Sequence, residues 1–115
     1  MSGAGHGTFD AQRFGVEASE SAGTVTLTLR GELDLSTLGE LEAALPELSP
    51  QDRLVLDLRP LAFMDSSGIR LVMRLDVEAR SRGWTLTLVS RAGAVRRLLE
   101  LCRVEDRVEV VEDLP

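Results

Sequence analysis

Hydrophobic and polar residues alternate along the first third of the chain in the manner of β-strands. Residues 14–18 fit a short strand, SESAG at 19–23 fits a turn, and residues 24–30 place valine and leucine on one face and threonine on the other. Alternation with a period of two, bounded by a turn, indicates a β-hairpin. We therefore predict that the domain begins with two antiparallel strands.

The hydrophobic spacing then changes to that of a helix. Apolar residues recur at helical intervals at Leu38, Leu41, Ala44, Leu45 and Leu48. Thr37 and Glu40 have the spacing of a capping box, which marks the helix start. Pro46 should end or bend this helix because proline cannot continue its hydrogen bonding.

Three further strands and two helices follow from the same reading. The apolar run at 53–58 predicts a strand buried on both faces, and a helix should extend from about Ser66 to Arg82, where Gly83 stops it. Residues 84–89 alternate as another strand, and residues 107–111 form the last one. Ser90 can cap a third helix, whose apolar face would hold Ala94, Val95, Leu98, Leu99 and Cys102.

The resulting order of elements, β, β, α, β, α, β, α, β, predicts an α/β fold. We expect a mixed β-sheet with an N-terminal hairpin and crossover helices packed on it. The 115 residues fit one domain. We assign residues 13–115 to this domain and residues 1–12, which are rich in glycine, to a flexible leader.

Charge and hydropathy indicate which classes of partner the protein should bind. The net charge of −6 argues against binding to nucleic acid or to anionic lipid and suits protein partners better. No stretch approaches the roughly 18 apolar residues of a membrane helix, and the N-terminus lacks the basic start and apolar segment of a secretory signal. We therefore expect a cytoplasmic protein without membrane association.

Cysteine and histidine are too few for a metal site. The single cysteine, Cys102, has leucine neighbours that suggest a buried structural thiol, and the only histidine, His6, lies in the leader. We expect no disulfide within the chain, no zinc and no cofactor.

The segment FMDSSGIR, residues 63–70, displays two hydroxyls where a strand gives way to a helix. The simplest interpretation is helix capping, because aspartate and serine are favoured N-caps. A nucleophilic serine lacks a base, since the only histidine is in the leader, GxSxG is absent and the chain has no lysine. A phosphate cradle lacks the glycine-rich motifs, and Asp65 would repel the ligand.

A serine that is itself phosphorylated is the remaining interpretation. A phosphoryl group adds roughly −1.5 to −2 charges. A helix N-terminus tolerates this charge, while a partner surface in close contact would not. That behaviour describes a binding switch.

The second helix carries an apolar stripe beyond the one that should pack on the sheet. Ile69, Met73 and Val77 recur at intervals of four, with Arg70 and Arg74 beside them. Either a neighbouring helix covers this stripe, or it forms the apolar centre of a partner site with an arginine rim.

Several motifs together resemble a known family. GELD at 31–34, VLDL at 55–58, FMDSSGI at 63–69 and the helix AVRRLLELC at 94–102 resemble the STAS domain. The similarity is greatest to bacterial anti-sigma factor antagonists of the SpoIIAA and RsbV type, and it runs from about Phe14 over nearly the whole chain.

The resemblance implies a function that the residues alone do not. In this family the first serine after the aspartate, here Ser66, is phosphorylated by a cognate anti-sigma factor that is a serine kinase, and a phosphatase reverses the reaction. The unphosphorylated antagonist binds the anti-sigma factor and frees the sigma factor, so the protein is not an enzyme. We expect a monomer with partner-binding residues at Asp34, Asp65, Ser67, Gly68, Ile69, Arg70 and Met73.

One departure from the family pattern concerns Arg70. Many relatives have a small residue at this position, often glycine, so a bulky cation alters the contact surface beside Ser66 and bears on which partner is bound.

Two alternatives remain open. The chain could be a STAS subunit of another assembly, such as a stressosome-like complex or a lipid transport system. From a different class, it could be a small serine hydrolase or nucleotide-binding enzyme, which labelling of Ser66 by a covalent probe or tight nucleotide binding would reveal.

Overall fold

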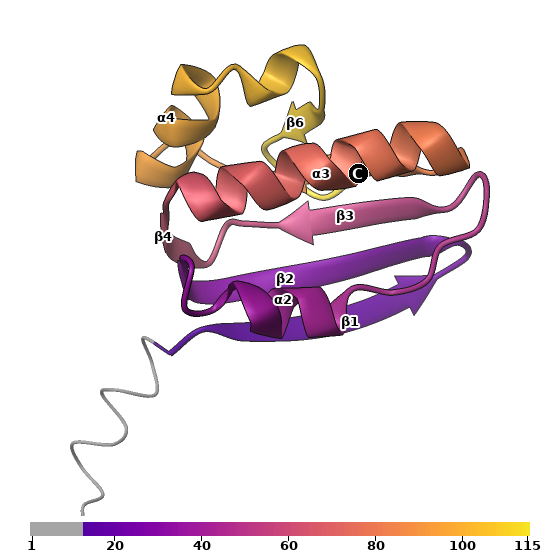
Figure 1. Ribbon diagram of the computed structural model, residues 1–115, viewed down its shortest axis with the longest axis horizontal. Helices are drawn as coiled ribbons and strands as arrows, with labels where there is room; N and C mark the ends of the chain where they lie inside the picture. Colours follow the sequence, from indigo (N-terminus) through magenta and orange to yellow (C-terminus); the bar gives the residue numbers. More distant parts are fainter. Residues whose placement is uncertain (1–12) are drawn as a thin grey trace, which may run out of the picture.

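The computed structural model describes residues 13–115 (Figure 1). The expected leader at residues 1–12, with His6, lies outside the described residues. The elements in chain order are β1 (Gly15–Ser21), β2 (Thr24–Leu33), α2 (Leu38–Ala44), β3 (Arg53–Asp57), β4 (Leu61–Met64), α3 (Ser66–Arg82), β5 (Thr85–Val89), α4 (Ala94–Leu101), the 3₁₀-helix η1 (Val104–Asp106) and β6 (Glu109–Val111).

The strands form one mixed sheet in the order β1-β2-β3-β5-β6. Only the hairpin pair β1 and β2 is antiparallel, and its turn consists of Ala22 and Gly23, both with positive φ. The pairs β2–β3, β3–β5 and β5–β6 are parallel. The predicted α/β fold with an N-terminal hairpin and crossover helices is confirmed.

The strand β4 was not predicted. It has four residues and pairs in parallel with the C-terminal end of β2, beyond the point where β2 contacts β3. Such a short element has no readable hydrophobic period, because its strand form depends on the distant partner.

The helices pack on one face of the sheet (Figure 1). The alternate residues of β2, β3 and β5 that pack in the core include fully buried leucines, at Leu27, Leu29, Leu54, Leu56 and Leu88. Leu71, Val72 and Leu75 of α3 and Leu99 of α4 complete this core. Among residues 13–115, no helix is long and apolar enough to cross a lipid bilayer.

Two expected helix caps are wrong in detail. Thr37 does precede α2, but its hydroxyl makes no capping bond; it donates to the carbonyl of Glu32 at 2.9 Å and accepts from the amide of Asp34 at 3.0 Å. Ser90 does not cap α4, because α4 begins at Ala94 and Gly93 occupies the N-cap position.

The predicted buried thiol is also wrong. Helix α4 ends at Leu101, and Cys102 follows it with an exposed side chain. Only Val95 and Leu99 of the expected apolar face are buried, while Leu98 is half-buried and Ala94 is exposed. The helix is too short to carry its packing stripe as far as Cys102.

Candidate functional site

The GELD segment lies where β2 changes its neighbouring strand. Gly31 has φ +86°, and a β-carbon there would come within 2.6 Å of the backbone oxygen of Arg13. The register of β2 against β4 shifts between Gly31 and Glu32, as at a β-bulge. Glycine at this position therefore lets β2 leave β3 and pair with β4.

Parallel pairing of β2 with β4 brings the two sequence motifs together. Leu33 is the register partner of Met64, and the amide of Asp65 donates to the carbonyl of Leu33 at 3.2 Å. Both strands end there, so Asp34 and Asp65 begin neighbouring loops at the same edge of the sheet. The site thus joins segments about thirty residues apart in sequence.

Asp34 is fixed as a carboxylate by its own loop. Its Oδ1 accepts the hydroxyl of Ser36 at 2.6 Å and the amide of Ser36 at 2.9 Å. The hydrogen bond from the Ser36 hydroxyl is the main cause that lowers the pKa of Asp34; partial desolvation opposes it, and the bonds from the Ser36 backbone and from Thr37 add to the lowering. Asp34 is half-buried, so it presents a fixed negative charge at the surface.

Asp65 caps the N-terminus of α3. Its Oδ1 accepts the amide of Ser67 at 2.8 Å, which satisfies one of the free N–H groups of the first turn. Ser66 is the first residue of the helix and is exposed, whereas Ser67 is half-buried. The Ser66 hydroxyl forms no hydrogen bond with any residue in the described part of the chain. The two serines, equivalent in sequence, are therefore distinct in accessibility.

Gly68 is buried, although we expected it among the partner-binding residues. A β-carbon there would lie 2.7 Å from Cγ of Met64 and 3.1 Å from Cδ2 of Leu33. Glycine lets the first turn of α3 rest directly on the ends of β2 and β4. Gly68 thus lies beneath the serine loop, residues 65–68, and little of its own surface is exposed.

The second apolar stripe of α3 is only partly covered. Ile69 and Met73 are half-buried and pack against the core, while Val77 is 60% exposed. Asp76 and Arg80 lie on the same side of α3 as Ile69 and Met73, at helical spacing. Asp76 accepts a hydrogen bond from the Arg107 side chain, and Arg80 donates one to the Arg107 carbonyl. This side of α3 therefore faces the segment after α4. Ile69 and Met73 are thus partly covered by packing against the core, whereas Val77 is exposed.

Arg70 and Arg74 differ in their surroundings. Arg74 forms an ion pair with Glu42 of α2. Arg70 is exposed and has no ion-pair partner among residues 13–115. Arg70 is therefore available on the surface, one helical turn after Ser66.

The site displays a hydroxyl close to two carboxylates, those of Asp34 and Asp65. Residues 13–115 contain no histidine or lysine to serve as a base. The same residues hold no cluster of three or more His, Cys, Asp and Glu side chains that could bind a metal ion. The arrangement presents an exposed hydroxyl at a helix N-terminus, close to the carboxylates of Asp34 and Asp65.

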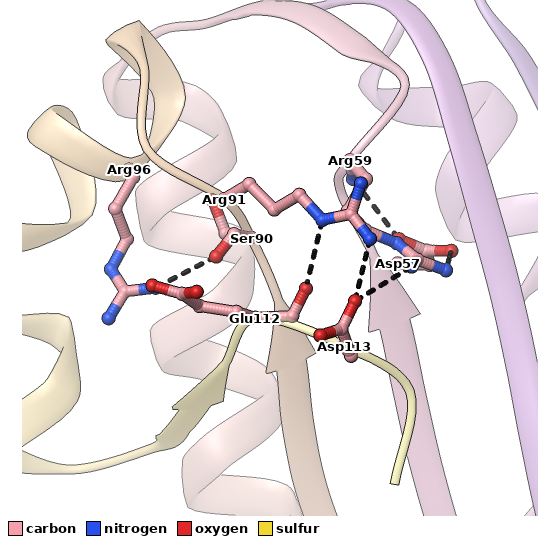
Figure 2. A network of polar contacts seen from close by, with 7 residues as sticks. All are labelled: Asp57, Arg59, Ser90, Arg91, Arg96, Glu112 and Asp113. Carbon is pink, nitrogen blue, oxygen red and sulfur yellow. Dashed lines mark hydrogen bonds and ion pairs between the residues drawn. The ribbon is translucent and has the colours of Figure 1, made fainter.

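A second polar cluster joins the C-terminal segment to the ends of β3 and β5 (Figure 2). Asp57 accepts two hydrogen bonds from the Arg59 guanidinium at 2.9 Å, and Asp113 accepts from Arg91 at 2.6 Å and lies 3.6 Å from Arg59. Burial by itself would raise the pKa of Asp57, but the hydrogen bonds and charge of Arg59 outweigh it and lower the pKa. The bond to Arg91 likewise lowers the pKa of Asp113.

This cluster was missed in the sequence. Its signal is an aspartate at the end of a buried strand with an arginine two residues later, in VLDLR. Because a guanidinium keeps each carboxylate ionised, the cluster links the C-terminal segment to the ends of β3 and β5 through charged contacts.

Comparison with known proteins places the chain among STAS domains. The family model described as "Mlab, STAS domain" matches residues 16–112. A solved anti-sigma factor antagonist from Mycobacterium paratuberculosis is 22% identical with a TM-score of 0.73, and the match covers 90% of this chain and 89% of that chain.

Two further solved structures are similar. The anti-sigma factor antagonist SpoIIAA in its unphosphorylated form is 21% identical with a TM-score of 0.65, over 84% of this chain and 88% of that chain. An antisigma-factor antagonist STAS domain from Rhodobacter sphaeroides is 21% identical with a TM-score of 0.54, over 66% and 85%. At these identities the solved structures establish a shared fold.

Proposed function

The chain belongs to the STAS domain family, and from this premise we propose that it is an anti-sigma factor antagonist whose binding is switched by phosphorylation of Ser66. The unphosphorylated protein binds a cognate anti-sigma factor, a serine kinase, and thereby frees the sigma factor. Phosphorylation ends the complex, and a phosphatase restores the active form. In this role the protein is a binding module without catalytic activity of its own.

The observation that carries this proposal is the exposure of Ser66 at the start of α3, next to the paired strand ends that hold Asp34 and Asp65. A kinase needs an accessible hydroxyl, and Ser66 meets this requirement better than the half-buried Ser67. Similarity to two solved antagonists over more than four-fifths of the chain supports the same role.

Charge explains how the modification would act. A phosphoryl group on Ser66 would bring roughly −1.5 to −2 charges to an edge that already carries two carboxylates. The helix N-terminus stabilises this charge, so the fold persists while the surface becomes more negative and bulkier. A partner that fits closely against Asp34, Asp65, Ser67, Ile69 and Met73 would be repelled.

Arg70 gives this chain a further means of control. It lies four residues after Ser66 on the same exposed side of α3, at the spacing that favours ion pairs along a helix. A phosphate on Ser66 would pair with Arg70 and withdraw that cation from an acidic partner.

The decisive experiment is mass spectrometry of the protein incubated with ATP and an anti-sigma factor serine kinase from the same organism. We expect one added phosphate on the peptide that contains Ser66, unchanged modification of Ser67→Ala and none of Ser66→Ala. Ser66→Ala should form a complex that ATP does not dissolve, and Ser66→Asp should bind more weakly, with a partial effect because a carboxylate carries less charge than a phosphate.

Three results would contradict the proposal. If a stable complex formed and no phosphate were added, residues 65–68 would act only as a binding loop and helix cap. Equal binding by Ser66→Ala and Ser66→Asp would refute the charge switch. Co-purification with a membrane or scaffold complex, and no affinity for such kinases, would indicate a STAS subunit of another assembly.

A further inference from the structure

Next to the serine loop, β4 and α4 enclose an apolar groove. Its lining residues are Phe63, Met64, Ala94, Arg97, Leu98 and Leu101, and its volume is about 260 Å³. We call it the β4–α4 groove. Two large apolar side chains are conspicuously exposed in it, Phe63 at 45% and Leu101 at 75%.

Helix α4 has one side buried in the core and a second side that forms a wall of the groove. Val95 and Leu99 point into the core and are buried. Ala94, Arg97, Leu98 and Leu101 follow at i, i+3, i+4 and i+7, which places them on one side of the helix, toward the groove. A helix of eight residues with two apolar faces, one of them open, is typical of a surface that another chain covers.

Charge identifies the chemistry of the occupant. Arg97 is the only charged residue that lines the groove, and its guanidinium forms no ion pair with any residue in 13–115. Arg70, one turn after the start of α3, is likewise exposed and unpaired within that range. Most other arginines of this acidic chain are in ion pairs, at positions 53, 59, 74, 80, 91, 96, 103 and 107. A free cation in the wall of an apolar groove, with a second on α3, complements a segment that is both apolar and acidic.

The groove is continuous with the proposed switch. Met64 forms part of its wall and is followed directly by Asp65 and Ser66. Met64 also contacts the buried turn at Gly68, so the groove and the serine loop share one rigid support. A partner that touches Ser66 therefore lies within reach of Phe63 and Leu101.

We propose that the β4–α4 groove is the docking site for an amphipathic acidic helix of the anti-sigma factor. Apolar side chains of that helix fill the groove between Phe63 and Leu101, and its carboxylates face Arg97 and Arg70. This is helix-in-groove recognition, in which apolar anchors give affinity and rim charges give orientation. The inference rests on the proposed function for the identity of the partner, and it adds a second contact surface to the serine loop.

The test measures the affinity of the unphosphorylated full chain for the anti-sigma factor by isothermal titration calorimetry. Leu101→Glu and Arg97→Glu should each weaken binding by about tenfold or more, as expected for a buried apolar anchor and for a charge reversal. The loss caused by Arg97→Glu should shrink as salt is raised, because salt screens the attraction.

Matched controls separate the groove from general effects of charge. Leu114→Glu places the same carboxylate on an exposed leucine outside the groove, and Arg82→Glu makes the same charge reversal at the far end of α3. Both should bind within about twofold of the unmodified protein. Leu101 and Arg97 are exposed, so thermal melts should show that their variants remain folded.

The results distinguish the two proposals. If Ser66→Asp weakens binding while Leu101→Glu and Arg97→Glu bind normally, the groove inference is overturned and the proposed function stands. If the groove variants and the control variants lose affinity alike, the effect is general charge and the groove inference is again overturned. If the unmodified protein binds no anti-sigma factor, the proposed function fails and the assigned occupant fails with it.

Discussion

Single residues at the serine loop do separate tasks. Asp65 caps the helix, Gly68 allows the close approach to Met64, and Ser66 remains free. Asp34 is held ionised by Ser36. The loop is thus kept in shape by neighbours of the serine, so a change at the serine alters the surface without altering its support.

The proposed pairing of phospho-Ser66 with Arg70 predicts a titration difference. Phosphorus NMR of the phosphorylated protein should give a higher phosphate pKa in Arg70→Gln than in the unmodified chain, because Arg70 favours the doubly charged phosphate. The difference should correspond to one exposed helical ion pair, about 0.3 to 0.5 kcal/mol. Arg82→Gln is the control, and identical titration of all three proteins would exclude the pair.

At the scale of elements, local signals predicted α3 better than the strands that build the site. The predicted span of α3, Ser66 to Arg82, is confirmed because both of its ends depend on adjacent residues: Asp65 caps the start, and Gly83 adopts the left-handed conformation at the end. Strand β4 was missed because only its pairing with β2 makes it a strand.

The same distinction applies to the candidate site. The segment pointed to Ser66 and Ser67 alike, and the choice of Ser66 rested on the family resemblance. The proximity of Asp34 to Asp65 depends on a bulge at Gly31 and on parallel pairing, neither of which has a local hydrophobic period. The β4–α4 groove could not be foreseen, since we expected the apolar face of α4 to extend to Cys102 and to be buried.

Packing of α3 on the strand ends predicts opposite effects for two glycines. Gly68→Ala should destabilise the protein by about 1 to 3 kcal/mol, because its methyl group would meet Met64 in a filled interior. Gly39→Ala in α2 meets nothing within 4 Å and should stabilise by about 0.5 to 1 kcal/mol through helix propensity. Urea denaturation measures both. Equal changes in the free energy of unfolding for the two substitutions would show that the close contact between Gly68 and Met64 does not restrict the side chain at position 68.

At the scale of the whole molecule, one face of the sheet is covered by helices, and the C-terminal segment is attached to the strand ends through charges. Asp57 is the buried member of that attachment, with only 4% of its surface exposed. Loss of its charge would leave Arg59 without its bidentate partner.

This arrangement predicts a dependence of stability on acid. The folded-state pKa of Asp57 is lowered, so its contribution is complete above the ordinary aspartate pKa of about 4 and is lost as the pH falls through the folded-state value. We expect Asp57→Asn to reduce Tm at pH 7 by about 5 to 15 °C.

The difference in Tm between Asp57→Asn and the unmodified protein should then shrink as the pH is lowered from 5 to 2, since the unmodified protein loses the same charge. Asp52→Asn is a control on a half-buried aspartate whose carboxylate makes one loop hydrogen bond. A difference in Tm for Asp57→Asn that stays constant with pH would assign the effect to packing.

The exposed thiol at the end of α4 also gives this protein a natural attachment point for a reporter. Cys102 is the only cysteine of the chain and directly follows Leu101, at the border of the β4–α4 groove. An environment-sensitive fluorophore attached there needs no engineered cysteine and no removal of others. Its emission would follow the arrival and departure of a partner in real time as ATP is added.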